Sequence, residues 1–212
     1  MNESLRPLPK LYPIIDREML DARGIGVEEY ARELRDAGVT LVQYRDKSGE
    51  PHEILRAAAA ITAVFAGVDA TLILNDRADL ALLAGWGVHV GHLDLAPGDA
   101  RRVVDAGSVL GVSTHSDAQI VAADASEADY VAVGPVFATS TKADAEPVIG
   151  REGVRRARAL TSKPLVAIGG ITRETARSVI EAGADSVAVI SGLLVKGERP
   201  GKVAEDFLEL LR

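Results

Sequence analysis

A hydroxyl-rich segment that carries a lysine lies in the middle of the chain, directly after a run of apolar residues. Residues 130–137 are uncharged and rich in valine, and Gly134 and Pro135 end a predicted buried strand there. The polar residues that follow are Thr139, Ser140, Thr141 and Lys142. Hydroxyls can donate hydrogen bonds to phosphate oxygens, and lysine adds a point charge. A solvated loop can have the same composition, so a phosphate or pyrophosphate site is predicted only if other strand ends converge here.

A basic cluster follows another predicted strand. Gln43, Arg45 and Lys47 alternate with Tyr44 and Asp46. If the chain stays extended this far, the first three side chains point to one side of the strand. An arginine and a lysine that point together favour a pyrophosphate ligand. The alternative is a surface cluster of charges that pair with neighbouring acidic residues.

Two carboxylates follow the next two predicted strands. Asn75 and Asp76 come at the end of one strand, and Asp94 comes a few residues after the other. Mg²⁺ is held in proteins by few carboxylates together with water and substrate phosphate oxygens. For Asp76 alone, capping of the following helix is the favoured interpretation, because aspartate is common at that position. The pairing with Asp94 beside a basic strand end favours a metal site.

Three further strand ends supply small polar groups. Ser113 ends a predicted strand, and His115 is interpreted as a packing or hydrogen-bonding residue. Gly170 ends a second strand, and Ile190 and Ser191 end a third. In barrels of alternating strands and helices, backbone N–H groups after the seventh and eighth strands form a recurrent phosphate site. A tight turn also needs glycines, but the position of this pair favours phosphate binding.

The elements that must position these residues alternate regularly along the chain. Strands are predicted at residues 11–16, 40–45, 71–76, 87–91, 109–114, 130–135, 164–168 and 186–190. Helices are predicted at residues 27–36, 51–65, 78–84, 116–125, 150–160, 172–182 and 202–211, with a short one after Pro97. This alternation predicts a single (β/α)8 TIM barrel over residues 11–212, after a loose segment at 1–10. An open doubly wound sheet is the alternative, although the glycine fingerprint of dinucleotide-binding sheets is absent after the first strand.

Composition limits the functional classes. The 212 residues are 47% hydrophobic and 26% charged, which is ordinary for a globular protein. The absence of cysteine excludes disulfides and thiolate chemistry, and the net charge of −7 argues against nucleic-acid binding. Without a signal peptide or a long apolar run, we expect a cytoplasmic protein that has no membrane partner. The sequence is compatible with a homo-oligomer and does not define its size.

Taken together and in this order, the strand-end motifs resemble those of the thiamine phosphate synthase family. The resemblance covers nearly the whole chain and is carried by QYRDK at 43–47, ND at 75–76, GVHVGHLDL at 87–95, GVSTHS at 111–116, GPVFATSTKADA at 134–145, AIGGI at 167–171 and VIS at 189–191. It implies a transferase that joins 4-amino-2-methyl-5-hydroxymethylpyrimidine diphosphate to 4-methyl-5-hydroxyethylthiazole phosphate, releasing pyrophosphate.

The resemblance also implies roles for single residues. Residues 43–47 (Gln43, Tyr44, Arg45, Asp46 and Lys47) and Asn75 would hold the pyrimidine diphosphate, with Arg45 and Lys47 on its phosphates. Asp76 and Asp94 would hold Mg²⁺, and Ser113 and Lys142 would contact the diphosphate or the ring. The thiazole phosphate would lie against Thr139, Ser140, Thr141, Gly170, Ile190 and Ser191.

The sequence departs from the family pattern at two places, and two other functions stay open. Ala138 stands where proline is usual, and His92-Leu93 stand where Gln-Glu is expected. Neither change removes a proposed ligand. A thiazole tautomerase of the same fold is one alternative, but it would have no use for the diphosphate residues. The other is a non-catalytic sensor of phosphate metabolites, which would not be expected to keep both metal carboxylates.

Overall fold

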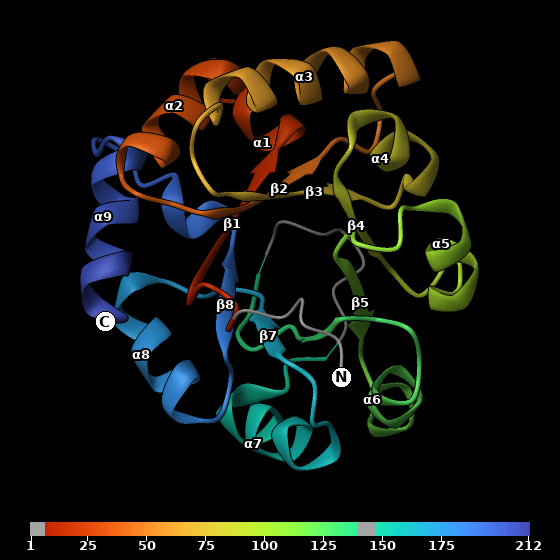
Figure 1. The fold of residues 1–212 in the computed structure, drawn as a ribbon. Coiled ribbons are helices and arrows are strands. Elements are labelled where there is room, and N and C mark those ends of the chain that lie inside the picture. Colours follow the sequence, from red (N-terminus) through yellow and green to blue (C-terminus); the bar gives the residue numbers. More distant parts are fainter. Residues whose placement is uncertain (1–6, 140–146) are drawn as a thin grey trace.

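Eight short strands close into a parallel barrel with helices on its outer side, as the computed structural model shows for residues 7–139 and 147–212 (Figure 1). The strands are β1 (Leu11–Asp16), β2 (Leu41–Arg45), β3 (Thr71–Asn75), β4 (Gly87–Val90), β5 (Leu110–Thr114), β6 (Tyr130–Val133), β7 (Leu165–Ile168) and β8 (Ser186–Val189). Each strand pairs with the next, and β8 pairs with β1, so the (β/α)8 prediction is confirmed.

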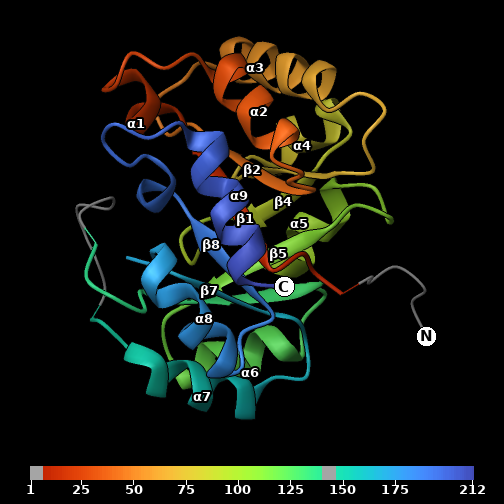
Figure 2. The ribbon, with the colours of Figure 1, turned by 90° about the vertical axis from the view of Figure 1, so that its left-hand side faces the viewer.

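The helices follow the strands in sequence and cover the barrel from outside (Figure 2). They are α1 (Arg17–Asp21), α2 (Val27–Asp36), α3 (Pro51–Val64), α4 (Ala78–Ala84), α5 (Pro97–Val103), α6 (Asp117–Asp124), α7 (Gly150–Leu160), α8 (Arg173–Glu181) and α9 (Pro200–Leu210), with a 3-10 turn η1 at Ser191–Leu193. Within the described residues, no helix is long and apolar enough to cross a lipid bilayer.

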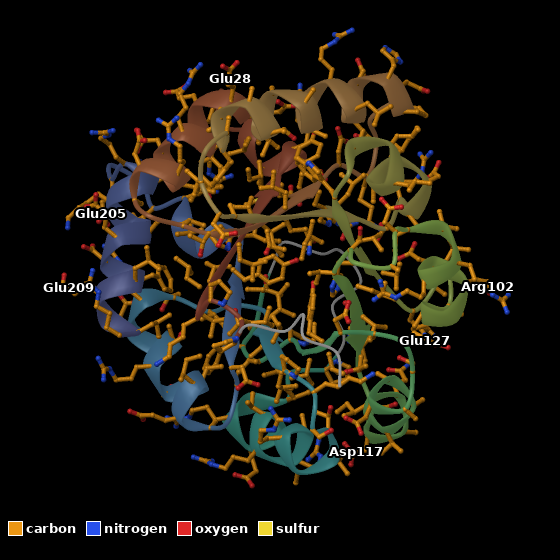
Figure 3. All side chains as sticks on the ribbon, in the orientation of Figure 1. Glu28, Arg102, Asp117, Glu127, Glu205 and Glu209 are labelled. Atoms are coloured by element: carbon orange, nitrogen blue, oxygen red, sulfur yellow. The ribbon has the colours of Figure 1, made fainter. Side chains whose placement is uncertain are left out.

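Two separate apolar cores result from the alternation of side chains along the strands. The larger core lies between the strands and the helices, and it buries Leu34, Ile61 and Phe207 completely. Burying one such side chain stabilises the fold by about 1.5–3 kcal/mol. The smaller core fills the barrel interior and includes Tyr12 and Tyr130. Charged side chains point outward from the helices and loops of the periphery, as Figure 3 shows for Glu28, Arg102, Asp117, Glu127, Glu205 and Glu209.

One row of residues across four neighbouring strands determines the shape of the barrel interior. The strand register aligns Asn75 with His89, His89 with Gly111, and Gly111 with Tyr130. A Cβ on Gly111 would lie only 2.0 Å from the Tyr130 ring. The missing side chain of Gly111 therefore makes room for the Tyr130 ring inside the barrel.

The expected elements are all present, with small shifts at their ends. The strand predicted at residues 130–135 ends at Val133, because Gly134 and Pro135 leave the strand and proline has no N–H for strand pairing. Helix α9 begins two residues before the expected start, with Pro200 in its first turn, where its ring is tolerated. Helix α1 and the turn η1 were not predicted, because both are too short to show a helical period.

We predict that Gly111→Ala lowers the free energy of unfolding by about 1–3 kcal/mol, because the new methyl group overpacks the barrel interior against Tyr130. Urea denaturation measures the change. Gly107→Ala is the matched control, since a Cβ there meets no atom within 4 Å. Equal, small effects of the two substitutions would contradict this account of the interior.

Candidate active site

Two connected cavities open where the strands end. The larger has a volume of about 460 Å³ and the smaller about 40 Å³. Ser113, Ala132, Ile168, Ala188 and Ile190 line both, so the small cavity forms the floor of the large one. A volume of this size is typical of sites for small organic ligands.

Most of the predicted site residues that the structure describes surround these cavities. Lys47, Asp94, Ser113, Thr139, Gly170, Ile190 and Ser191 line the large cavity. Gln43, Arg45, Asn75, Ser113 and Ile190 line the small one. The predicted residues Ser140, Thr141 and Lys142 lie outside the described part of the chain.

The basic side of the site is held by a carboxylate that the sequence analysis did not single out. Arg45 forms an ion pair with Asp16 at the end of β1, and the Asp16 side chain is only 2% exposed. The other oxygen of Asp16 accepts a hydrogen bond of 3.0 Å from the N–H of Met19 and so caps helix α1. Asp16 therefore restricts the Arg45 guanidinium to one orientation beside the cavity.

Tyr44 and Asp46 are not brought to the cavities. Tyr44 is fully buried in the outer core, because neighbouring strand residues face opposite sides of the sheet. Asp46 accepts hydrogen bonds from the N–H groups of Ser48 and Gly49, at 3.2 and 2.7 Å, and from the Tyr44 hydroxyl at 3.1 Å. Asp46 therefore shapes the loop that carries Lys47.

Asp76 and Asp94 lie close together, beside Lys47. Asp76 forms an ion pair with Lys47, and Asp94 accepts a hydrogen bond of 2.7 Å from the N–H of Gly91. Burial raises the pKa of Asp76, and the neighbouring Asp94 carboxylate raises it further, whereas Lys47 opposes both effects. Asp76 also has a φ of 65°, the left-handed conformation that residues other than glycine seldom adopt.

These features fit a divalent cation. Two adjacent carboxylates repel each other, and a cation between them would remove the repulsion. No group of three or more metal-binding side chains occurs within residues 7–139 and 147–212. Two carboxylates completed by water and phosphate oxygens are a typical set of ligands for Mg²⁺ rather than for a metal enclosed by the protein.

The helix-capping interpretation of Asp76 is wrong. Helix α4 has Arg77 at its N-cap position, and the Arg77 side chain makes no capping hydrogen bond. The left-handed backbone of Asp76 separates β3 from α4 and turns its carboxylate toward Lys47.

The neighbouring Asn75 lines the small cavity, and its buried Nδ2 has no hydrogen-bond partner within the described residues. An unsatisfied buried donor costs about 1–3 kcal/mol, which a ligand acceptor would recover.

The far end of the large cavity is formed by backbone from two strand ends. Gly169, Gly170 and Ile171 follow β7, and Ile190, Ser191 and Gly192 follow β8. Gly170 has a φ of 61°, and a Cβ there would lie 2.4 Å from the Ala138 carbonyl oxygen. Glycine is required at this position because the segment that leads to Thr139 packs directly against it.

His115 forms hydrogen bonds, as its position predicted, and Ser116 caps the helix that follows it. His115 Nδ1 donates to the Gly134 carbonyl oxygen over 3.1 Å, and the Ser116 hydroxyl caps helix α6. Gln119 of that helix accepts a hydrogen bond of 2.7 Å from the His115 N–H. His115 thus joins the ends of β5 and β6 at the cavity wall.

The floor of the site contains polar residues to which the sequence analysis assigned no function. Tyr12, His89 and Tyr130 form a buried hydrogen-bonded group below Ser113. Their inward direction follows from strand register, which the sequence alone does not show. The available signal was a polar residue within each of three mostly apolar strands.

Comparisons with known proteins agree with this geometry. A family model described as thiamine monophosphate synthase matches residues 11–193. A thiamine-phosphate synthase from Koribacter versatilis is 50% identical over 207 residues, which cover 96% of each chain. A thiamine-phosphate synthase from Methanoculleus marisnigri is 44% identical and covers 89% of each chain.

Solved structures show the same similarity. Thiamine phosphate pyrophosphorylase from Pyrococcus furiosus superimposes with a TM-score of 0.84 at 30% identity, covering 96% of this chain and 95% of that one. A 3-hexulose-6-phosphate synthase shares only the fold, with a TM-score of 0.66 at 18% identity.

We predict that Asp16→Asn lowers the free energy of unfolding by about 3 kcal/mol, because it leaves the largely buried Arg45 charge without its partner. Asparagine keeps the cap of α1, so the substitution isolates the ion pair. Asp36→Asn, which breaks the exposed pair with Arg35, is the control and should cost less than about 1 kcal/mol. Urea denaturation compares the two variants. Equal losses of unfolding free energy would show that the Asp16–Arg45 pair stabilises the fold no more than an exposed pair does.

Proposed function

The chain belongs to the thiamine monophosphate synthase family, and on this premise we propose that its cavity joins the pyrimidine diphosphate to the thiazole phosphate. The products are thiamine phosphate and pyrophosphate. The observation that carries the proposal is that Arg45, Lys47 and Asp94 line the two connected cavities, while Asp76, which lines neither, lies against Lys47 and Asp94. The other end of the large cavity is formed by glycine-rich backbone.

The two substrates would occupy different parts of the site. We place the aminopyrimidine ring on the floor, near Gln43 and Asn75, where the buried Nδ2 of Asn75 lacks an acceptor among the described residues. Its diphosphate would extend toward Arg45 and Lys47. The thiazole phosphate would lie against Gly170 and Ser191, and residues 139–142 would contribute hydroxyls and the Lys142 charge. Apolar walls at Ile168, Ala188 and Val189 would exclude water between the substrates.

The chemistry requires stabilisation of a leaving group. The bond between the pyrimidine methylene carbon and the diphosphate oxygen breaks, and its electron pair leaves with pyrophosphate. Arg45 and Lys47 would neutralise the charge that develops on the departing oxygens. Mg²⁺ held by Asp76 and Asp94 would supply additional charge neutralisation.

The second step forms the new bond. The lone pair of the thiazole nitrogen captures the methylene carbon, whose positive charge the aminopyrimidine ring stabilises. This nitrogen has no proton to lose, so the step needs no strong general base. The contribution of the protein is to hold both partners in line and to keep water from the cation.

The proposal is tested by mixing purified protein with both substrates and Mg²⁺ and following thiamine phosphate as fluorescent thiochrome. Product that disappears on addition of EDTA supports both the reaction and the metal. Isomerisation of the thiazole phosphate without condensation would instead indicate a tautomerase. Binding of both ligands without turnover would indicate a sensor.

We predict that Asp76→Asn lowers turnover by on the order of 10²-fold or more, as expected for a lost charge-stabilising group. It should also abolish the increase in thermal unfolding midpoint that Mg²⁺ gives the wild type. Asp79→Asn, in the helix α4 that follows Asp76, is the control, since its carboxylate pairs with Arg77 at the exposed surface. Near-normal turnover of Asp76→Asn would contradict the metal assignment.

Without Mg²⁺, raising the pH should shift the free energy of unfolding of the same two variants in opposite directions relative to the wild type. The folded state raises the pKa of Asp76, mainly through burial, so ionisation of this group destabilises the fold as pH increases from about 4 to 7. The hydrogen bond from Arg77 lowers the pKa of Asp79, so ionisation of that group stabilises the fold mainly below about pH 4, and only a small part of the gain remains between pH 4 and 7.

Asp76→Asn should therefore gain stability relative to the wild type as pH rises, whereas Asp79→Asn should lose a little. Urea denaturation in EDTA at pH 4 and pH 7 measures both differences. A loss of stability in Asp76→Asn at pH 7 would show that the Lys47 ion pair outweighs the burial of the carboxylate.

A further inference from the structure

A continuous chain of hydrogen bonds crosses the barrel interior and ends at the cavity. Gln43 Nε2 lies 2.8 Å from the Tyr12 hydroxyl, which lies 2.9 Å from the Tyr130 hydroxyl. The Tyr130 hydroxyl lies 2.8 Å from His89 Nδ1, and His89 Nε2 lies 2.8 Å from Ser113 Oγ. Five side chains from five strands thus connect the floor of the barrel with a hydroxyl that lines the large cavity.

This hydrogen-bond chain is buried, so its side chains must satisfy one another's hydrogen-bonding groups. Tyr12 and Tyr130 are 1% and 0% exposed, and His89 is 8% exposed. Burial raises the pKa of both phenols well above the ordinary value, so each keeps its proton. The rings of His89 and Tyr130 are stacked at 5.5 Å between centroids, which restricts rotation of the imidazole. A buried hydroxyl without a partner would cost about 1–3 kcal/mol.

The direction of donation along the hydrogen-bond chain follows from its first donor. The amide nitrogen of Gln43 can only donate, so the Tyr12 oxygen accepts and the Tyr12 proton goes to Tyr130. The Tyr130 proton then goes to His89 Nδ1. A neutral imidazole that accepts at Nδ1 carries its proton on Nε2, so His89 donates to Ser113.

We propose that Tyr130 and His89 act as positioning residues: Tyr130 holds His89 in the Nε2–H tautomer, and His89 thereby leaves the Ser113 proton for an anionic ligand oxygen. Ser113 accepts from His89, so its own proton is available to the cavity. The ligand in question is a diphosphate oxygen, and this part of the inference rests on the proposed function. A serine hydroxyl that accepts a hydrogen bond from His89 always presents its own O–H as a donor to the leaving group.

The opposite direction is the competing arrangement. If Gln43 presented its oxygen to Tyr12, every proton in the chain would reverse, His89 would carry its proton on Nδ1, and Ser113 would donate to His89. Ser113 would then present only lone pairs to an anion, which is unfavourable. The two arrangements differ in a measurable way, because they place the imidazole proton on different nitrogens.

The tautomer of His89 can be measured directly in the ligand-free protein. Long-range ¹H–¹⁵N spectra of protein labelled with ¹⁵N-histidine distinguish a protonated ring nitrogen from a bare one, and the chain has only 4 histidines. The His89→Gln spectrum assigns the ring. A bare Nδ1 and a protonated Nε2 support the proposal. A protonated Nδ1, alone or in an imidazolium, overturns it.

Two phenylalanine variants form a matched pair for the role of Tyr130. Tyr130→Phe keeps the ring over Gly111 but removes the donor to Nδ1, so the Nδ1–H tautomer should appear in the His89 spectrum. Tyr12→Phe removes a hydroxyl from the same cluster but leaves Tyr130 able to donate, so the tautomer should be unchanged. The same tautomer in wild type and both variants would show that Tyr130 does not control it.

Binding of inorganic pyrophosphate with Mg²⁺, followed by calorimetry, tests the effect on the ligand. Tyr130→Phe should weaken binding by roughly 3- to 10-fold, the equivalent of one lost hydrogen bond. In a Ser113→Ala background the same substitution should have no further effect, because Tyr130 acts only through Ser113. Additive losses would overturn the positioning role and indicate a general structural defect.

The two hypotheses can fail separately. A wild-type protein that does not bind pyrophosphate overturns the proposed function and the ligand part of this inference. The spectra of the ligand-free protein still decide the direction of the hydrogen-bond chain in that case.

Discussion

Closure of the sheet is the constraint on which the rest of the structure depends. Because eight parallel strands pair in a ring, their carboxyl ends all meet at one rim, and residues that are far apart in sequence become neighbours. Arg45, Asp94 and Ser191 lie around one pair of cavities for this reason. The same closure gives the strands an interior face that must be filled, and here polar side chains fill part of it.

Those polar side chains are tolerated only because they satisfy one another. The hydrogen bonds from Gln43 to Ser113 leave no member of that chain without a partner, in contrast to Asn75, whose buried amide nitrogen has none among the described residues. Asp76 also destabilises the ligand-free fold, since it combines a left-handed backbone with a partly buried charge beside Asp94. Such costs are typical of functional sites, where a ligand or metal offsets them on binding.

Much of the architecture could be predicted from the chain alone. Short uncharged strands that alternate with amphipathic helices indicate a barrel, and the observed element bounds differ from the expected ones by at most a few residues. The carboxylate pair and the basic strand end were predicted as neighbours because all strand ends share one rim. The roles of Asp16, Tyr12, His89 and Tyr130 were not predicted, since single polar residues inside mostly apolar strands show no pattern before their partners are known.

The sequence by itself determined which strand ends carry polar residues, because strand and helix periods are local properties of the chain. The tertiary structure decided which of those residues face the site. Strand register buries Tyr44 against the helices and turns Gln43 toward the barrel interior. The left-handed backbone conformation of Asp76 places its carboxylate beside Lys47 and not at the cap of helix α4. Side-chain direction depends on pairing with other strands, and pairing is a non-local property that no segment of sequence contains.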